Sequence, residues 1–145
     1  MDMQWKSFEG LQGIEIDRVW AEQFNLFQEG EQWEFIFSQA LVEYSKGDVF
    51  GYLRVTAEEN EDGDDYLVIH TQDLPSPFAY SFEKEITNRP FIQASSIQLK
   101  KGRVVSVKES ETVKGFGPVT LTFEMEQGQL TFQAQAGYMI NMKLT

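Results

Sequence analysis

The sequence contains no cysteine, which excludes a disulfide-bonded scaffold, a thiolate nucleophile and a cysteine-ligated zinc site. Its one histidine, His70, cannot build a metal centre that needs several histidine ligands. No stretch approaches the roughly 18 apolar residues needed to cross a bilayer. The first residues also lack the basic and apolar segments of a signal peptide. We therefore expect a cytoplasmic protein with no metal and no membrane partner.

Basic residues are also scarce, because 12 Lys and Arg stand against 23 Asp and Glu, for a net charge of −11. A nucleic-acid-binding protein carries the opposite sign, so no nucleic acid is expected as a partner. The acidity is uneven along the chain: residues 58–65 hold six carboxylates, whereas residues 91–145 carry four acidic and six basic residues, for a net charge of +2. Negative charge is therefore concentrated in the first two thirds of the chain, whereas the last third is slightly positive.

Most of the chain alternates apolar and polar residues with a period of two, which is typical of β-strands with one buried face. In residues 119–126, Val119, Leu121, Phe123 and Met125 share one face, and the Thr and Glu residues share the other. A second alternating run follows the glycine at 128, with Leu130, Phe132, Ala134 and Ala136 on its apolar face. The length of 145 residues and the absence of linkers or repeats indicate a single all-β domain over residues 1–145.

Turn signals recur at intervals of 12 to 17 residues, near positions 30, 47, 63, 76, 89, 102, 116 and 128. They divide the chain into about nine strand-sized segments, which nearest-neighbour hairpins would join into an antiparallel up-and-down meander. A meander of that length tends to curl and close, so we expect a closed barrel, calycin-like in outline, rather than a two-sheet sandwich. The Gly-x-Trp signature of lipocalins is missing at Gly13-Ile14-Glu15-Ile16, so no family is assigned.

Three segments leave local alternatives open. Trp20, Phe24 and Phe27 have helical spacing, so a short helix over residues 19–27 competes with a strand. A helical turn over residues 80–87 is a further option. Gly137 interrupts the last alternating run and predicts a bulge or bend there.

The acidic residues of positions 58–65 straddle an Asp-Gly turn and predict the solvent-exposed tip of a hairpin. A solvated turn that keeps the protein soluble is the commoner explanation of such a loop, and the functional interpretation is a docking site for a basic protein or a calcium site. An EF-hand calcium loop is excluded because Gly63 falls at the wrong position of the twelve-residue pattern. The six residues are Glu58, Glu59, Glu61, Asp62, Asp64 and Asp65.

A candidate basic patch is formed by Lys100, Lys101 and Arg103 beside the expected turn at Gly102. An exposed hairpin with ordinary surface charges is the alternative for these residues. The patch is too small to form the extended basic surface that binds nucleic acid.

Two aromatic triplets stand out among the 12 Phe, five Tyr and three Trp of the chain. Aromatic residues at alternate strand positions most often form a core face, but inside a barrel they could also line a site for an apolar ligand. The triplets are Trp33, Phe35 and Phe37, and Phe78, Tyr80 and Phe82.

Catalytic motifs are weak throughout the sequence. Two carboxylate pairs, Glu124 with Glu126 and Glu83 with Glu85, have the strand spacing that a glycosidase could use, and His70 is a candidate base. A row of solvent-facing residues explains the same pairs. No Gly-x-Ser-x-Gly elbow, P-loop or dinucleotide fingerprint is present, so no cofactor is expected.

The leading hypothesis is a non-enzymatic domain that binds a basic protein through its acidic loop. The second hypothesis is a carrier of an apolar ligand inside a barrel, and the third is a carboxylate-based hydrolase.

Overall fold

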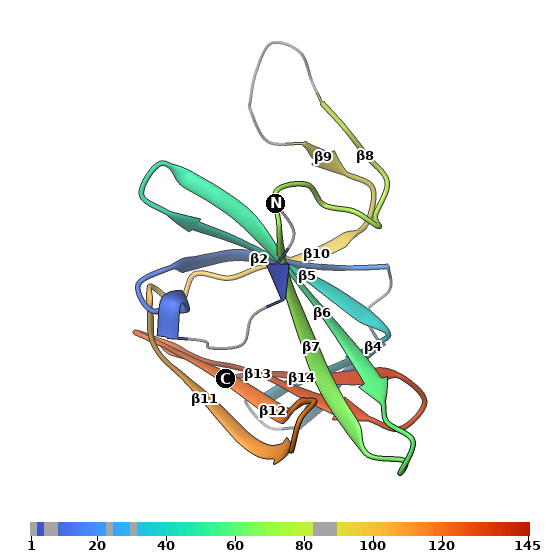
Figure 1. The fold of residues 1–145 in the computed structure, drawn as a ribbon. Helices are drawn as coiled ribbons and strands as arrows, with labels where there is room; N and C mark the ends of the chain where they lie inside the picture. Colours follow the sequence, from blue (N-terminus) through green and yellow to red (C-terminus); the bar gives the residue numbers. More distant parts are fainter. Residues whose placement is uncertain (1–2, 5–8, 23–24, 30–31, 83–89) are drawn as a thin grey trace.

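The computed structural model describes residues 3–4, 9–22, 25–29, 32–82 and 90–145 (Figure 1). Its strands form two six-stranded antiparallel sheets and one two-stranded sheet. In spatial order, the first sheet consists of β1 (Met3–Gln4), β7 (Asp65–Gln72), β6 (Val49–Glu59), β5 (Gln39–Lys46), β2 (Glu15–Ala21) and β10 (Ser95–Gln98). The second consists of β11 (Val104–Val113), β12 (Gly117–Met125), β13 (Gly128–Gln135), β14 (Met139–Leu144), β4 (Gln32–Phe37) and β3 (Asn25–Glu29).

The third sheet pairs β8 (Tyr80–Ser81) with β9 (Phe91–Ile92) and projects from the first sheet (Figure 1). A three-residue 3-10 helix, η1 (Glu9–Leu11), precedes β2. In the described residues no helix has the length and apolar character that a bilayer crossing demands.

The all-β antiparallel prediction is confirmed, but the closed barrel is wrong, because no sheet closes on itself in the described chain. The chain instead bends from one sheet into the other. Only Ser38 separates β4 from β5, yet these strands belong to different sheets, and β10 and β11 are divided in the same way by residues 99–103. Strands that switch sheets at such corners produce two facing layers with open edges.

Several predicted turns join hairpins, namely those that connect β5 to β6, β6 to β7, β11 to β12, and β12 to β13. The turn signals near positions 76 and 102 instead lie where the chain passes between different sheets. Gly137 is not a bulge within one strand. It lies in the turn of a hairpin between β13 and β14, where Gly137 has φ 81° and Tyr138 has φ 60°. Two successive positive φ values reverse the chain tightly, which a period-two pattern does not reveal.

The helical alternatives are settled only in part. Residues 19–21 belong to β2 and residues 25–27 belong to β3, so the helix predicted over residues 19–27 is wrong for these residues. Residues 23–24 lie outside the described residues. Residues 80–81 form strand β8, and residues 83–89 lie outside the described residues.

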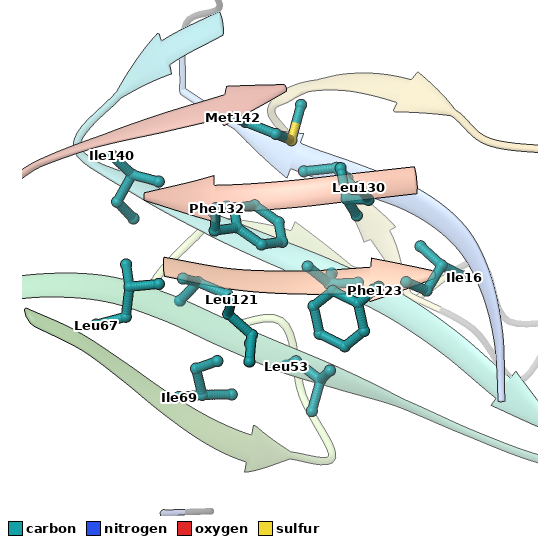
Figure 2. Packing of buried hydrophobic residues seen from close by; sticks show 14 of the residues in the cluster. Ile16, Leu53, Leu67, Ile69, Leu121, Phe123, Leu130, Phe132, Ile140 and Met142 are labelled. Carbon is teal, nitrogen blue, oxygen red and sulfur yellow. The ribbon is translucent and has the colours of Figure 1, made fainter. Parts of the chain in front are cut away.

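The main core lies between the two large sheets (Figure 2). Leu53 and Ile69 of the first sheet pack against Phe123 and Phe132 of the second, whose rings meet edge to face at 6.2 Å between centroids. Leu121, Met125, Leu130 and Ala134 are buried on the predicted apolar faces of β12 and β13. Period-two alternation therefore correctly located the buried side of these strands.

A second, smaller core lies on the opposite face of the first sheet. There Leu41 and Tyr52 pack with Phe78 and Ile92, which belong to the segment that carries β8 and β9. Leu41 alternates along β5 with Ala40 and Val42 of the main core, so β5 is apolar on both faces. The first sheet is consequently covered on both sides over part of its area.

Candidate functional site

The acidic residues cluster at the free end of the β6–β7 hairpin. Glu58 and Glu59 end β6, Asp65 begins β7, and Glu59 faces Asp65 in the last described strand pair. All but the half-buried Asp65 are exposed: Glu58, Glu59, Glu61, Asp62 and Asp64. The structure therefore brings the six predicted residues together at one hairpin tip.

Asn60 organises this tip. Its side-chain oxygen accepts hydrogen bonds from the backbone N–H groups of Asp62, at 3.0 Å, and Asp64, at 2.9 Å. Its backbone N–H donates to the carbonyl oxygen of Asp64 at 3.1 Å, and Gly63 closes the turn with φ 83°. An Asn ahead of an Asp-Gly pair signals an Asx-type turn, so the role of Asn60 could have been predicted from the sequence.

The tip lies beside two aromatic rings that come from different sheets. Tyr66 follows the acidic tip on β7, and Phe116 lies in the β11–β12 turn. Their ring centroids are 5.1 Å apart, and 51% of Phe116 is exposed. The rings, Asn60 and the carboxylates of Glu59, Glu61 and Asp62 line a surface cleft of about 360 Å³. Sequence reasoning missed both rings because their partnership depends on the meeting of the two sheets.

No lysine or arginine of the described part is ion-paired with the six carboxylates. Nor do the described residues contain a group of three or more His, Cys, Asp or Glu placed to hold a metal ion. The like charges of the tip therefore repel one another, and no lysine or arginine within the described ranges forms an ion pair that offsets them.

The candidate basic patch is divided between two surroundings. Lys100 and Lys101 lie in the connection from β10 to β11 and line a cleft together with Arg18. Arg103 lies against Glu15, with 3.7 Å between its Nε and Oε1 of the carboxylate, and its backbone N–H donates to Glu126. The segment is not a hairpin, because β10 and β11 belong to different sheets.

The two aromatic triplets do not form one cavity. Phe35 and Phe37 are in the main core, and Phe78 is in the second core with the half-buried Tyr80 at its margin. Trp33 is 39% exposed, and Phe82 is 51% exposed. None of these six side chains lines the cleft at the acidic tip or the cleft beside Arg18. Phe35, Phe37 and Phe78 serve packing in the two cores, whereas Trp33 and Phe82 are exposed at the surface.

The carboxylates of Glu124 and Glu126 are engaged by cross-strand partners. Glu124 receives a hydrogen bond from Ser106 Oγ at 2.5 Å and pairs with Lys108 Nζ at 2.8 Å. Hydrogen bonds from Lys108 and Ser106 lower the pKa of Glu124, which disfavours it as a proton donor near neutral pH. Glu126 accepts the backbone N–H of Arg103 at 2.8 Å. The other pair, Glu83 and Glu85, lies outside the described residues.

His70 lies half-buried on β7, on the face opposite the main core. Its cross-strand neighbour on β6 is Arg54, a cation, whereas a general base is usually oriented by a carboxylate. This arrangement gives no support to a catalytic role for His70.

The chain matches no protein-family model, no curated protein and no solved structure in the three comparisons made. At the acidic tip, three of the six predicted residues, Glu59, Glu61 and Asp62, line one cleft together with two aromatic rings.

Proposed function

We propose that this protein works by binding a basic protein partner at the tip of its β6–β7 hairpin. The observation that carries the proposal is the cleft in which Tyr66 and Phe116 adjoin Glu59, Glu61 and Asp62. A carboxylate-rich rim beside an exposed ring suits a side chain that is positively charged at its end and apolar along its stem.

Electrostatics favours a cationic partner. Six carboxylates within eight positions create a strongly negative local field, on a chain whose net charge is −11. A partner's lysine or arginine side chains would relieve their mutual repulsion and speed the encounter. Both effects weaken as salt is added, because exposed charges are screened over about 10 Å at 0.1 M ionic strength.

The aromatic pair adds contact chemistry that the acidic residues lack. The face of a Tyr or Phe ring attracts a guanidinium or ammonium group, by about 0.5–1 kcal/mol at exposed sites. Phe116 leaves half of its surface available for such a contact, and the tilt of 44° between the rings of Tyr66 and Phe116 presents two differently oriented faces. An arginine of the partner, whose flat guanidinium stacks on rings and pairs with carboxylates, fits this cleft best.

The proposal predicts which of two charge-matched variants loses the partner. One variant neutralises four tip residues, Glu58, Glu59, Glu61 and Asp62, as their amides. The control neutralises four exposed carboxylates elsewhere, those of Glu22, Asp48, Glu109 and Glu111. Both variants change the net charge equally, so a difference between them reports the site and not the overall charge.

The experiment captures partners from a cell extract at low salt, identifies them, and measures the Kd of the purified pair by calorimetry. The tip variant should bind at least about tenfold more weakly, whereas the control should stay within about twofold of the original Kd. Equal affinity of both variants, or a partner with no basic surface, would overturn the proposal.

A further inference from the structure

A cleft of about 480 Å³ lies beside the turn that joins β5 to β6. Its walls include Gln12 and Gly13 of the loop before β2, and Ser45, Lys46 and Gly47 at the end of β5. β6 begins just after this turn and ends at the acidic tip, so the length of this 11-residue strand, roughly 35 Å, separates the two clefts. A volume of this size accommodates a small molecule.

Backbone pairing holds the walls of this cleft in place. The backbone N–H of Gly13 donates to the carbonyl oxygen of Val104 at 2.8 Å, which ties the loop to β11. Glu15, at the start of β2, pairs with Ser45 on one side and with Arg103 on the other. The segments that carry the lining residues are therefore preorganised for a ligand.

Cations outnumber acids in this cleft, on a chain whose net charge is −11. Its cations are Lys46 and Arg103 and its acid is Glu15, so the formal charge of the lining is +1. The neighbouring cleft is lined by three acids and three cations, among them Arg18 and the directly opposite Glu43, and has no net charge. Of these two clefts, the one beside the β5–β6 turn is therefore the one that favours an anion.

Both cations of the cleft can reach a ligand. Lys46 is exposed and forms no ion pair with a carboxylate of the described residues. The closest atoms of Arg103 and Glu15 are Nε and Oε1, and their separation of 3.7 Å exceeds a hydrogen bond. A guanidinium has five N–H donors, so an arginine that faces Glu15 with its Nε can bind a ligand through its terminal nitrogens.

The lining carries no apolar side chain. Apart from its two glycines and three charged residues, it offers the amide of Gln12 and the hydroxyl group of Ser45. Amides and hydroxyls both donate and accept hydrogen bonds, as the hydroxyl groups of a sugar do. An apolar ligand would leave these groups without partners.

We infer that this cleft binds a small hydroxylated carboxylate of the sugar-acid class. The carboxylate of the ligand lies between Lys46 and Arg103, because an arginine fork and an ammonium group both suit its two oxygens. The hydroxyl groups of the ligand hydrogen-bond to Gln12 and Ser45. Charge decides between anions: the +1 lining balances one carboxylate, whereas a phosphomonoester, with a charge near −2 at pH 7, would leave excess negative charge beside Glu15.

The test titrates the purified protein with galacturonate and gluconate at low, matched ionic strength and follows the backbone amide signals by NMR. At least one of these acids, at up to about 20 mM, should shift the signals of Gln12, Gly13 and residues 45–47. Galactose, which has no charge, and pentanoate, which has no hydroxyl group, should bind at least about tenfold more weakly. No shift with either acid, or equal affinity for galactose or pentanoate, would overturn the inference.

Trigalacturonate distinguishes the two sources of such a ligand. Binding at least about tenfold tighter than that of galacturonate identifies a unit of an acidic polysaccharide, and equal binding identifies the free sugar acid.

Variants locate the site and separate it from the acidic tip. Lys46→Gln and Arg103→Gln, both at exposed positions, should each weaken binding of the acid at least about tenfold. The control, Lys114→Gln, removes the same charge from an exposed lysine that lines neither this cleft nor the one at the acidic tip. The variant with four neutralised tip residues should stay within about twofold of the original affinity, whether or not the tip binds a protein. Equal affinity of both cleft variants and the control would contradict the assignment.

Discussion

Gly117, the first residue of β12, approaches the backbone of β7 so closely that a Cβ atom built on it would lie 2.6 Å from the carbonyl oxygen of Leu67. Real Cβ atoms do not come that near to a backbone oxygen, so only glycine fits here without a shift of one strand. This contact joins the two large sheets at the point where Phe116 meets Tyr66. The close approach of the β7 and β12 backbones at Gly117 therefore helps to place Phe116 beside Tyr66 in the cleft at the acidic tip.

Replacing Gly117 with alanine should separate the strands at this contact. We expect Gly117→Ala to destabilise the protein by about 1–3 kcal/mol, as overpacking does elsewhere. Urea unfolding measures the change, and Thr120→Ala, at a half-buried position of the same strand, is the control. A Gly117→Ala variant as stable as the control would show that the close approach is not rigid.

The main core should be far more sensitive than the exposed aromatic residues. Phe123 is fully buried, so Phe123→Ala removes a ring that packs on Phe132 and should cost about 3–5 kcal/mol. Phe82 is 51% exposed, and Phe82→Ala should cost less than about 1 kcal/mol. Thermal and urea unfolding compare the two, and similar losses would contradict the division into core and surface.

The carboxyl group of Glu124 should show the effect of its two partners in a pH titration. Its pKa in the folded protein lies below the ordinary 4.5, because Lys108 and Ser106 donate to the ionised form. The resulting stability is present above the unfolded-state pKa and is lost as the pH falls through the lowered folded-state value. Lys108→Gln should therefore raise the pKa of Glu124 towards its ordinary value.

The same variant should also change the pH profile of unfolding. Lys108→Gln should destabilise the protein more at about pH 7 than at about pH 3, where Glu124 is protonated in the unfolded chain. NMR titration of Glu124 and urea unfolding at both pH values provide the measurements. An equal loss at both pH values would show that Lys108 acts by packing instead of charge.

Asn60 should control the shape of the acidic tip without altering its charge. Asn60→Ala removes the acceptor of two backbone N–H groups and should destabilise the hairpin by about 1 kcal/mol. Binding of a basic partner should weaken severalfold, because the carboxylates of Glu61, Asp62 and Asp64 lose the fixed arrangement of the turn. Asn60→Asp, which retains the acceptor, should keep the turn. Unchanged amide shifts at residues 61–64 in Asn60→Ala would contradict this role.

Much of the local structure was predictable because it depends on neighbours in the chain. Alternation placed Leu121 and Phe123 on a buried face, and the Asp62-Gly63 pair marked a hairpin tip that carries the six acidic residues. Two polar residues between Ile16 and Val19 break the period of two in β2. The break alone does not show that Ile16 and Arg18 flank a bulge, which depends on the pairing with β5.

The sequence by itself determined an antiparallel all-β chain, the faces of its longest strands and the acidic hairpin. These features follow from side-chain periodicity and turn chemistry, which act over a few residues. Only the tertiary structure decided that the chain bends at Ser38 into two open sheets, that Phe116 joins Tyr66, and that Arg18 lies opposite Glu43. Each of these depends on strand pairing or sheet packing between segments far apart in the chain, which local patterns do not encode.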